Sequence, residues 1–138
     1  MRIHASEASG TASSALWDML ADLPAWPRWC PTVTVLQPDG PLRVGTTARV
    51  VQPGLRPAVW TIDDVVPGRS FRWSSRGPGF VVTEDHLLLP RGPGTGIEVR
   101  LQITGLMAWA VALIAGRALR DSLPRWARAL AAQPHPTA

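Results

Sequence analysis

The stretch of sequence that decides the fold spans residues 58–89 and reads AVWTIDDVVPGRSFRWSSRGPGFVVTEDHLLL. It holds three segments rich in β-branched and aromatic residues, separated by the turn sequences PG at 67–68 and RGPG at 76–79. Such segments are typical of strands, and short Gly/Pro sequences are typical of the turns that join antiparallel neighbours. We therefore predict three consecutive antiparallel strands here, with the clearest alternation of apolar and polar residues over 70–75.

The same patterns, followed outward in both directions, predict the remaining elements. Further strands are expected over 2–8, 33–36, 46–52 and 96–103, and helical segments over 11–21 and 106–132. Residues 23–32 contain three prolines and two tryptophans, which indicates a tight turn or a single helical turn. Pro124 interrupts the last helical segment, so we expect a kink there, or a break with Asp121 or Ser122 capping a second helix.

One face of the predicted sheet is strongly apolar. Trp60 and Ile62 share a face of one strand, and Phe71 and Trp73 share a face of the next, because side chains alternate along a strand. The long apolar helix at 106–132 is expected to cover this face. Seven tryptophans in 138 residues are difficult to accommodate as ordinary core residues, because the indole is large and its N–H needs a partner. The pattern leaves two alternatives open, a ligand cavity between sheet and helix or a solid core.

The composition excludes several classes of protein. Hydrophobic residues make up 46% of the 138 residues and charged residues 17%, which excludes an intrinsically disordered chain and predicts one domain, 1–132, with a flexible tail at 133–138. All 14 basic residues are arginines without a run of three, so we expect no nucleic-acid partner. The most apolar stretch, 106–115, is shorter than the roughly 20 residues of a membrane span. We therefore expect no integral membrane segment.

The number and spacing of the cysteines and histidines indicate the cellular compartment and whether a metal site is expected. Cys30 is the single cysteine, so an intrachain disulfide is excluded and a reducing, cytoplasmic location is expected. A catalytic cysteine needs a nearby base, and none can be placed beside Cys30 from the sequence. His4, His86 and His135 lie far apart without metal-ligand spacing. We predict neither a metal nor a cofactor.

Seven short motifs in a fixed order, together with the order of elements, resemble the polyketide cyclase/SRPBCC family of START-like, Bet v 1-like domains. The resemblance covers residues 3–131. The motifs that carry it are Leu16-Trp17-Asp18, Leu23-Pro24-Ala25-Trp26-Pro27-Arg28-Trp29, Val44-Gly45-Thr46, Gln52-Pro53-Gly54 with Ala58-Val59-Trp60, Pro67-Gly68-Arg69-Ser70-Phe71-Arg72-Trp73, Gly77-Pro78-Gly79 leading to His86, and Gly94-Thr95-Gly96.

The resemblance implies an α+β helix-grip fold. In that fold an antiparallel sheet of about seven strands wraps around a long C-terminal helix, and two short helices follow the first strand. It also implies a deep apolar cavity that holds lipids, sterols, plant hormones or aromatic polyketides. Members that act as aromatase/cyclases use an arginine in a stretch corresponding to residues 63–66, and a tyrosine phenol. Residues 63–66 contain no arginine and the chain contains no tyrosine, which argues against that chemistry.

Ligand contacts are expected from the apolar face of the sheet, the short helical segment and the C-terminal helix. Trp26 and Trp29 are candidates for one end of the cavity, the alternative being a hydrophobic plug, and Trp60 and Trp73 are candidates for its wall, the alternative being ordinary core. Arg49 can hold an anionic ligand group if it points inward, whereas outward it is a solvated charge. The full expected set is Trp26, Trp29, Arg49, Trp60, Ile62, Phe71, Trp73, Val82, His86, Leu101, Ile103, Met107 and Val111.

His86 is the candidate catalytic residue. Counted by twos from Phe80, it shares a strand face with Val82, Glu84 and Leu88. An inward histidine beside a carboxylate can act as an acid/base pair, whereas the interpretation we favour is a core histidine bonded to a backbone carbonyl. A bulge in the strand would move Glu84 to the outer face.

The sequence therefore predicts a protein, monomeric or homodimeric, that binds a small hydrophobic molecule, lipid-like or aromatic polyketide-like. One alternative is a polyketide cyclase/dehydratase-like enzyme that uses His86 as acid and base. A further alternative is a protein-interaction module of the co-chaperone type, which requires an exposed apolar patch around Trp109 or Trp126.

Overall fold

The three strands predicted from the central stretch lie next to one another as β4 (Ala58–Val66), β5 (Ser70–Gly77) and β6 (Phe80–Arg91). They belong to a computed structural model that describes residues 1–133. β7 (Gly94–Thr104) follows β6 through a tight turn, and β1 (Arg2–Ser9) pairs antiparallel with β7. On the other side, β3 (Thr47–Val51) pairs with β4, and β2 (Val35–Pro38) forms the edge.

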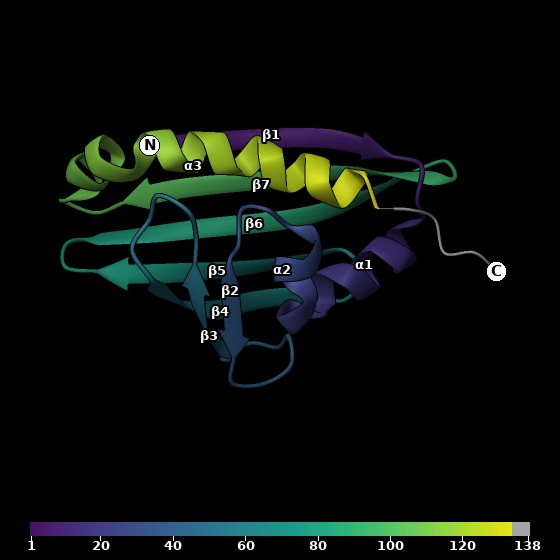
Figure 1. The fold of residues 1–138 in the computed structure, drawn as a ribbon, viewed down its shortest axis with the longest axis horizontal. Helices are drawn as coiled ribbons and strands as arrows, with labels where there is room; N and C mark the ends of the chain where they lie inside the picture. The colour runs from purple at the N-terminus through teal and green to yellow at the C-terminus, as the bar shows by residue number, and fades with distance from the viewer. Residues whose placement is uncertain (134–138) are drawn as a thin grey trace.

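The result is a seven-stranded antiparallel sheet in the order β1-β7-β6-β5-β4-β3-β2. Only β1 departs from the meander, because it pairs with the last strand at one edge of the sheet, and the helices that follow it lead the chain to β2 at the other edge (Figure 1). The alternation predicted from the sequence holds along β7, where Ile97, Val99, Leu101 and Ile103 are buried. Trp60 and Ile62 in β4 are both buried on the inner face by the same alternation, and a register shift between Ile62 and Asp64 places Val65 opposite the buried Phe71.

Short helices follow β1, as the family resemblance implied. They are α1 (Ser13–Ala21), the one-turn 3₁₀ helix η1 (Leu23–Ala25) and α2 (Trp26–Trp29). The long helix α3 (Ala108–Ala131) extends along the inner face of the sheet, with α1 and α2 beside its C-terminal half (Figure 1). A seven-stranded antiparallel sheet gripping a long C-terminal helix is the helix-grip fold, so this prediction is confirmed.

Of the two alternatives expected at Pro124, a kink or a break, the break is wrong. α3 continues through Pro124 to Ala131. Ser122 caps no second segment, because its hydroxyl donates to the carbonyl of Leu119 at 3.0 Å. An interior proline costs about 3 kcal/mol, but Leu123 and Trp126 beside it are buried. Burying one large apolar side chain contributes about 1.5–3 kcal/mol, so the packing of this half of α3 offsets the proline.

The two halves of α3 are covered to different degrees. Its buried residues all lie from Gly116 onward, and they are Gly116, Leu119, Leu123, Trp126, Ala127 and Leu130. The first two turns carry no buried residue. The hydrophobic core therefore fills the space beneath the second half of α3, whereas the first half extends beyond it.

The junction between β7 and α3 is held by glycine. Gly105 has φ +106°, and a Cβ atom placed on it would collide with the backbone oxygen of Gly79 in the β5–β6 turn. The Met107 N–H donates to that same oxygen at 2.8 Å. The start of α3 is thus fixed to the β5–β6 turn. Of the predicted tail at 133–138, only Gln133 falls among the described residues, and its carbonyl accepts a hydrogen bond from Thr11 Oγ1 at 3.3 Å.

Candidate functional site

An aromatic cluster occupies the space between the sheet and the second half of α3. Trp26 lies at its centre with its ring fully buried, and its indole N–H donates to the Leu20 carbonyl at 2.9 Å. Ring centroids lie 5.4 Å apart for Trp26 and Trp73, and 5.3 Å apart for Trp73 and Trp60. The members of the cluster are Trp26, Trp29, Trp60, Phe71, Trp73, His86 and Trp126.

His86 lies inside this cluster. It is fully buried and stacks on Phe71 with centroids 4.2 Å apart, while Trp126 approaches to 4.9 Å. Its Nε2 lies 2.5 Å from Glu84 Oε1, without the alignment of a hydrogen bond, and Trp73 Nε1–H donates to the same oxygen at 3.3 Å. β6 pairs with β5 and β7 in unbroken register, so Glu84 stays on the inner face.

The histidine therefore has the carboxylate neighbour of an acid/base pair but lacks space for a substrate. The residual void beside Glu84 and Trp126 measures ≈ 10 Å³, which is about the size that holds one water molecule. Within residues 1–133 the buried Nδ1 of His86 and the indole N–H groups of Trp29 and Trp126 have no hydrogen-bond partner. The backbone-carbonyl partner favoured from the sequence is absent among these described residues.

A cavity of ≈ 450 Å³ opens beside the cluster, between the sheet and the first half of α3. We call it the α3 cavity. Trp60 belongs to both features, because its ring contacts Trp73 on one side and lines the cavity on the other. The lining is contributed by the β3–β4 loop, strands β4 to β6 and one face of α3, and consists of Gln52, Leu55, Arg56, Pro57, Ala58, Val59, Trp60, Ser75, Arg76, Phe80, Val82, Val111, Ala115 and Leu119.

The ligand contacts expected from the sequence fall into separate groups. Trp60, Val82 and Val111 line the α3 cavity. Met107 lies at the start of α3 beside Gly79, outside that lining. The remaining inward residues belong to the aromatic cluster or the adjoining core. Trp29 is partly buried there, and the fully buried ones are Trp26, Ile62, Phe71, Trp73, His86, Leu101 and Ile103.

Arg49 requires a correction. The structure places it on the exposed outer face of β3. Ala48 and Val50, its neighbours along the strand, are buried, and Ala48 pairs with the inward-facing Trp60. Because side chains alternate, Arg49 points away from α3, so it does not reach a ligand held between the sheet and the helix.

Sequence reasoning missed several cavity residues. Ala115 and Leu119 continue the line begun by Val111 at four-residue spacing, which places all three on one helix face. This periodicity is readable in the sequence. Leu55, Arg56 and the rest of the β3–β4 loop carry no such signal, because a loop has no repeat that assigns its side chains to a face.

Cys30 is not activated as a nucleophile for the aromatic cluster or for the α3 cavity. It is buried, and burial raises the pKa of its thiol above the ordinary value. Its Sγ lies 3.0 Å from Thr32 Oγ1, and neither group is a base that would take the proton. Within residues 1–133, no three His, Cys, Asp or Glu side chains are grouped as metal ligands. His135 lies outside the described residues.

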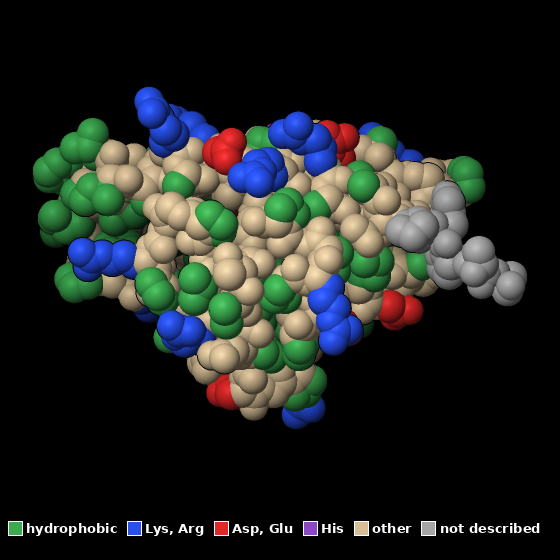
Figure 2. Space-filling view, viewed as in Figure 1, with side chains coloured by type: hydrophobic (Ala, Val, Ile, Leu, Met, Phe, Trp, Pro, Cys, Tyr) green, Lys and Arg blue, Asp and Glu red, His purple; other side chains and the backbone are tan. Residues whose placement is uncertain are grey.

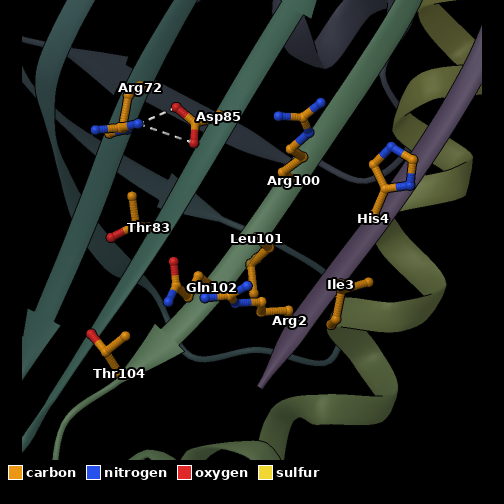
Figure 3. Close-up of a pocket in the computed structure, with 10 residues that line it drawn as sticks. All are labelled: Arg2, Ile3, His4, Arg72, Thr83, Asp85, Arg100, Leu101, Gln102 and Thr104. Carbon is orange, nitrogen blue, oxygen red and sulfur yellow. Dashed lines mark hydrogen bonds and ion pairs between the residues drawn. The ribbon is translucent and has the colours of Figure 1, made fainter.

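A larger hollow, ≈ 620 Å³, lies on the outer face of the sheet. Figure 3 shows polar and charged side chains of β1, β5, β6 and β7 around it, with the Arg72–Asp85 pair on one side. That pair is bonded at 2.7 Å, and the hydrogen bond to Asp85 raises the pKa of Arg72. Arg100 is paired with Glu98 at 2.6 Å. These contacts describe a solvated, charged surface, and they favour the α3 cavity as the site for an apolar molecule.

The chain belongs to the family described as polyketide cyclase / dehydrase and lipid transport, whose model matches residues 3–133. Comparison with curated protein sequences gives no match. No helix among the described residues is both long and apolar enough to span a bilayer.

Several solved structures share the fold at low sequence identity. Norcoclaurine synthase from Thalictrum flavum is 14% identical with a TM-score of 0.74, over 95% of this chain and 84% of that chain. The protein TTHA0849 from Thermus thermophilus is 14% identical with a TM-score of 0.75, over 94% of each chain. The di-domain ARO/CYC StfQ of the steffimycin biosynthetic pathway is 13% identical with a TM-score of 0.72, over 96% of this chain and 50% of that chain.

Proposed function

We propose that this protein binds a small apolar molecule, lipid-like or aromatic polyketide-like, in the α3 cavity. The observation that carries the proposal is the cavity itself, at ≈ 450 Å³ between the sheet and the first half of α3. Ligand sites are usually concave, mostly apolar and between about 300 and 1,000 Å³. Trp60, Phe80 and Val111 supply the apolar walls, and Arg56 and Arg76 are the charged members of the lining. We place this function in the cytoplasm, because the buried Cys30 requires no oxidising compartment.

The family and the neighbours support the proposal at a coarser level. The family description names both polyketide chemistry and lipid transport, and all three neighbours described above share the helix-grip fold. A shared fold does not decide between binding and catalysis, since unrelated functions occur on one fold. The choice therefore rests on the geometry of this chain.

That geometry favours binding over catalysis by His86. A general acid or base must come within about 3 Å of the proton that it transfers, directly or through one water. His86 is enclosed by Phe71, Trp26 and Trp126, and the void nearest to its partner Glu84 measures ≈ 10 Å³. A substrate in the α3 cavity contacts Trp60 and Val82 instead. We therefore assign His86 to the packed core in the proposed function.

Filling the cavity provides the test. Ala115 lines the α3 cavity, so Ala115→Phe places a ring inside it. We expect this variant to bind the fluorescent apolar probe N-phenyl-1-naphthylamine at least about tenfold more weakly than wild type, equivalent to ~1.4 kcal/mol. The readout is probe fluorescence during titration, followed by displacement with a panel of fatty acids, sterols and aromatic polyketides. Native mass spectrometry of the purified protein identifies any co-purified molecule.

Ala132→Phe is the matched control, because it makes the same change at an exposed position at the far end of α3. The control is expected to bind the probe as wild type does. Equal binding by Ala115→Phe and wild type would place the probe outside the α3 cavity and refute the proposed site. Failure of wild type to bind any member of the panel would refute the proposed function.

A further inference from the structure

An exposed apolar surface covers the first half of α3. Leu106 is 91% exposed, Trp109 67%, Leu113 79% and Ile114 86%. We call these four residues the apolar tip. Figure 2 shows hydrophobic side chains gathered at the end of the molecule where α3 begins. Scattered single apolar residues on a surface need no explanation, but a contiguous group of large ones marks an interaction site. Trp126, the other candidate centre for such a patch, is buried.

The apolar tip ends sharply along the helix. Residues three and four apart lie on one helix face, so Trp109 and Leu113 continue into Arg117 on the outer face of α3, and Leu106 directly precedes the helix. A helix that serves only as cover for a sheet is polar along its whole outer face. Here the outer face is apolar for two turns and charged afterwards.

The apolar tip is also firmly placed. Met107 follows Leu106, and its N–H is hydrogen-bonded to Gly79 of the β5–β6 turn at 2.8 Å. The close approach of Gly105 to the same turn fixes the point where α3 leaves the sheet. The exposed side chains therefore project from a segment whose backbone is held against the β5–β6 turn.

Arginines predominate among the charged residues next to the apolar tip, and the one acidic residue of α3, Asp121, is ion-paired with Arg125. Arg117 follows it on α3, and Arg56 and Arg76 line the α3 cavity beneath the same half of the helix. Residues 101–120 contain no Asp or Glu. Over the part of the chain that the structure describes, none of these three arginines forms an ion pair, whereas Arg72, Arg100 and Arg125 do.

We propose that the apolar tip inserts into the interface of an anionic lipid membrane, with Arg56, Arg76 and Arg117 contacting the lipid head groups. Helical surfaces that lie in a membrane interface combine Trp and Leu on the buried face with arginines at the head-group level. Long arginine stems allow the guanidinium to reach the head groups while the apolar side chains enter the acyl region. Trp109 has the amphipathic ring that concentrates at such interfaces.

A second copy of the chain fits this surface less well. A symmetric dimer pairs the same patch on both subunits. Joining two apolar tips face to face therefore gathers two sets of these three arginines around one interface, where the one acidic residue of α3, Asp121, is already paired with Arg125. An anionic bilayer supplies the opposite charge instead.

Membrane docking does not depend on the proposed ligand binding, although the two sites share a helix. Val111 and Ala115 line the α3 cavity, and Leu113 and Ile114 lie between them in sequence on the exposed side. Docking through the apolar tip therefore brings the α3 cavity against the membrane surface. An apolar ligand would then pass between bilayer and cavity with little exposure to water.

Co-sedimentation with lipid vesicles tests the proposal. Wild type is expected to bind vesicles of phosphatidylcholine and phosphatidylglycerol, and to bind vesicles of phosphatidylcholine alone at least about tenfold more weakly. Binding is expected to fall as salt rises, because salt screens the arginine contacts. The double variant Leu113→Asp, Ile114→Asp changes only exposed side chains and is expected to lose at least about tenfold in vesicle affinity. Arg117→Gln is expected to weaken binding to the anionic vesicles only.

The matched control is Val66→Asp, which also charges an exposed apolar side chain. Val66 pairs with Ser70 at the start of β5, at the far end of that strand from the β5–β6 turn that holds α3. The control is expected to bind vesicles as wild type does. Circular dichroism and binding of N-phenyl-1-naphthylamine report whether each variant keeps its fold and its cavity, separately from docking.

Three results would overturn the proposal. Wild type that fails to sediment with anionic vesicles has no such docking surface. Equal sedimentation of wild type and the Leu113, Ile114 variant places membrane contact elsewhere. A wild-type dimer in light scattering that becomes monomeric in the double variant assigns the apolar tip to a second copy of the chain.

Discussion

At the scale of single residues, Gly105 has the most demanding position in the chain. Its φ of +106° lies outside the range that L side chains adopt readily, and a Cβ atom there would collide with the Gly79 oxygen and lie 2.9 Å from Phe80 Cα. Both obstacles are backbone atoms, which cannot rotate away as a flexible side chain can. The position of α3 thus depends on the absence of one methyl group.

Gly105→Ala is therefore expected to lower the free energy of unfolding by about 3 kcal/mol, from the unfavourable dihedral angle and the collision together. Urea denaturation followed by circular dichroism measures this. Gly92→Ala serves as the comparison, because Gly92 has φ +53° and a Cβ atom added to it would have nothing within 4 Å; its expected loss is about 1 kcal/mol. Equal losses in the two variants would mean that the turn yields and that Gly105 does not fix α3.

Residue orientation was predictable where a strand has one clearly apolar face. Counting by twos along β6 placed His86 and Glu84 inward, and the structure brings them into contact. The same count could not orient Arg49, because apolar side chains occur on both faces of β3. Its orientation follows from the register with β4, where Ala48 lies opposite Trp60. That pairing is a tertiary fact absent from the local sequence.

At the scale of elements, the identity and order of strands and helices followed from the sequence better than their lengths. β6 extends to Arg91, and β7 begins at Gly94. The two strands pair through Pro90 opposite Thr95, although local turn residues suggested earlier ends. α3 likewise continues through Pro124, because the burial of Leu123 and Trp126 outweighs the local preference.

Pro124 should consequently be a site where stability can be gained. Pro124→Ala restores an N–H that can bond to the carbonyl four residues earlier in α3, so the free energy of unfolding is expected to rise by about 1–3 kcal/mol. Differential scanning calorimetry reports the change. Pro27→Ala is the control, since Pro27 lies in the first turn of α2, where proline is well tolerated. Loss of stability in Pro124→Ala would show that the proline ring itself is needed in the packing beneath α3.

At the scale of the whole molecule, the structure contains both a cavity and a solid core, and they lie under different halves of α3. Aromatic rings fill the space under its second half, and the α3 cavity lies under its first half. Sequence patterning identified the apolar face of the sheet but not this division. It depends on where α3 begins relative to the sheet, and the β7–α3 junction at Gly105 fixes that point.

This division predicts how the protein responds to a ligand. A molecule that binds only the folded chain stabilises it by about 2.7 kcal/mol at a hundredfold excess over its Kd, which for a domain of this size raises Tm by roughly 8–12 °C. The best-binding member of the fatty-acid, sterol and polyketide panel is expected to produce this shift in wild type and in Ala132→Phe. Ala115→Phe should show a much smaller shift at the same concentration. A full shift in Ala115→Phe would contradict binding in the α3 cavity.

The packing of the tryptophans has an optical consequence. Trp26, Trp29, Trp60, Trp73 and Trp126 form a continuous chain of neighbours with centroid separations between 5.3 and 6.2 Å. At such distances the electronic transitions of indole rings couple, so these five absorb as one excitonic unit with a split circular-dichroism band and share their excited state by energy transfer. Trp60 connects this unit to the α3 cavity, whereas Trp109 stands apart in solvent. Light therefore distinguishes the two sites: a ligand perturbs the coupled band, and a membrane shifts the emission of Trp109.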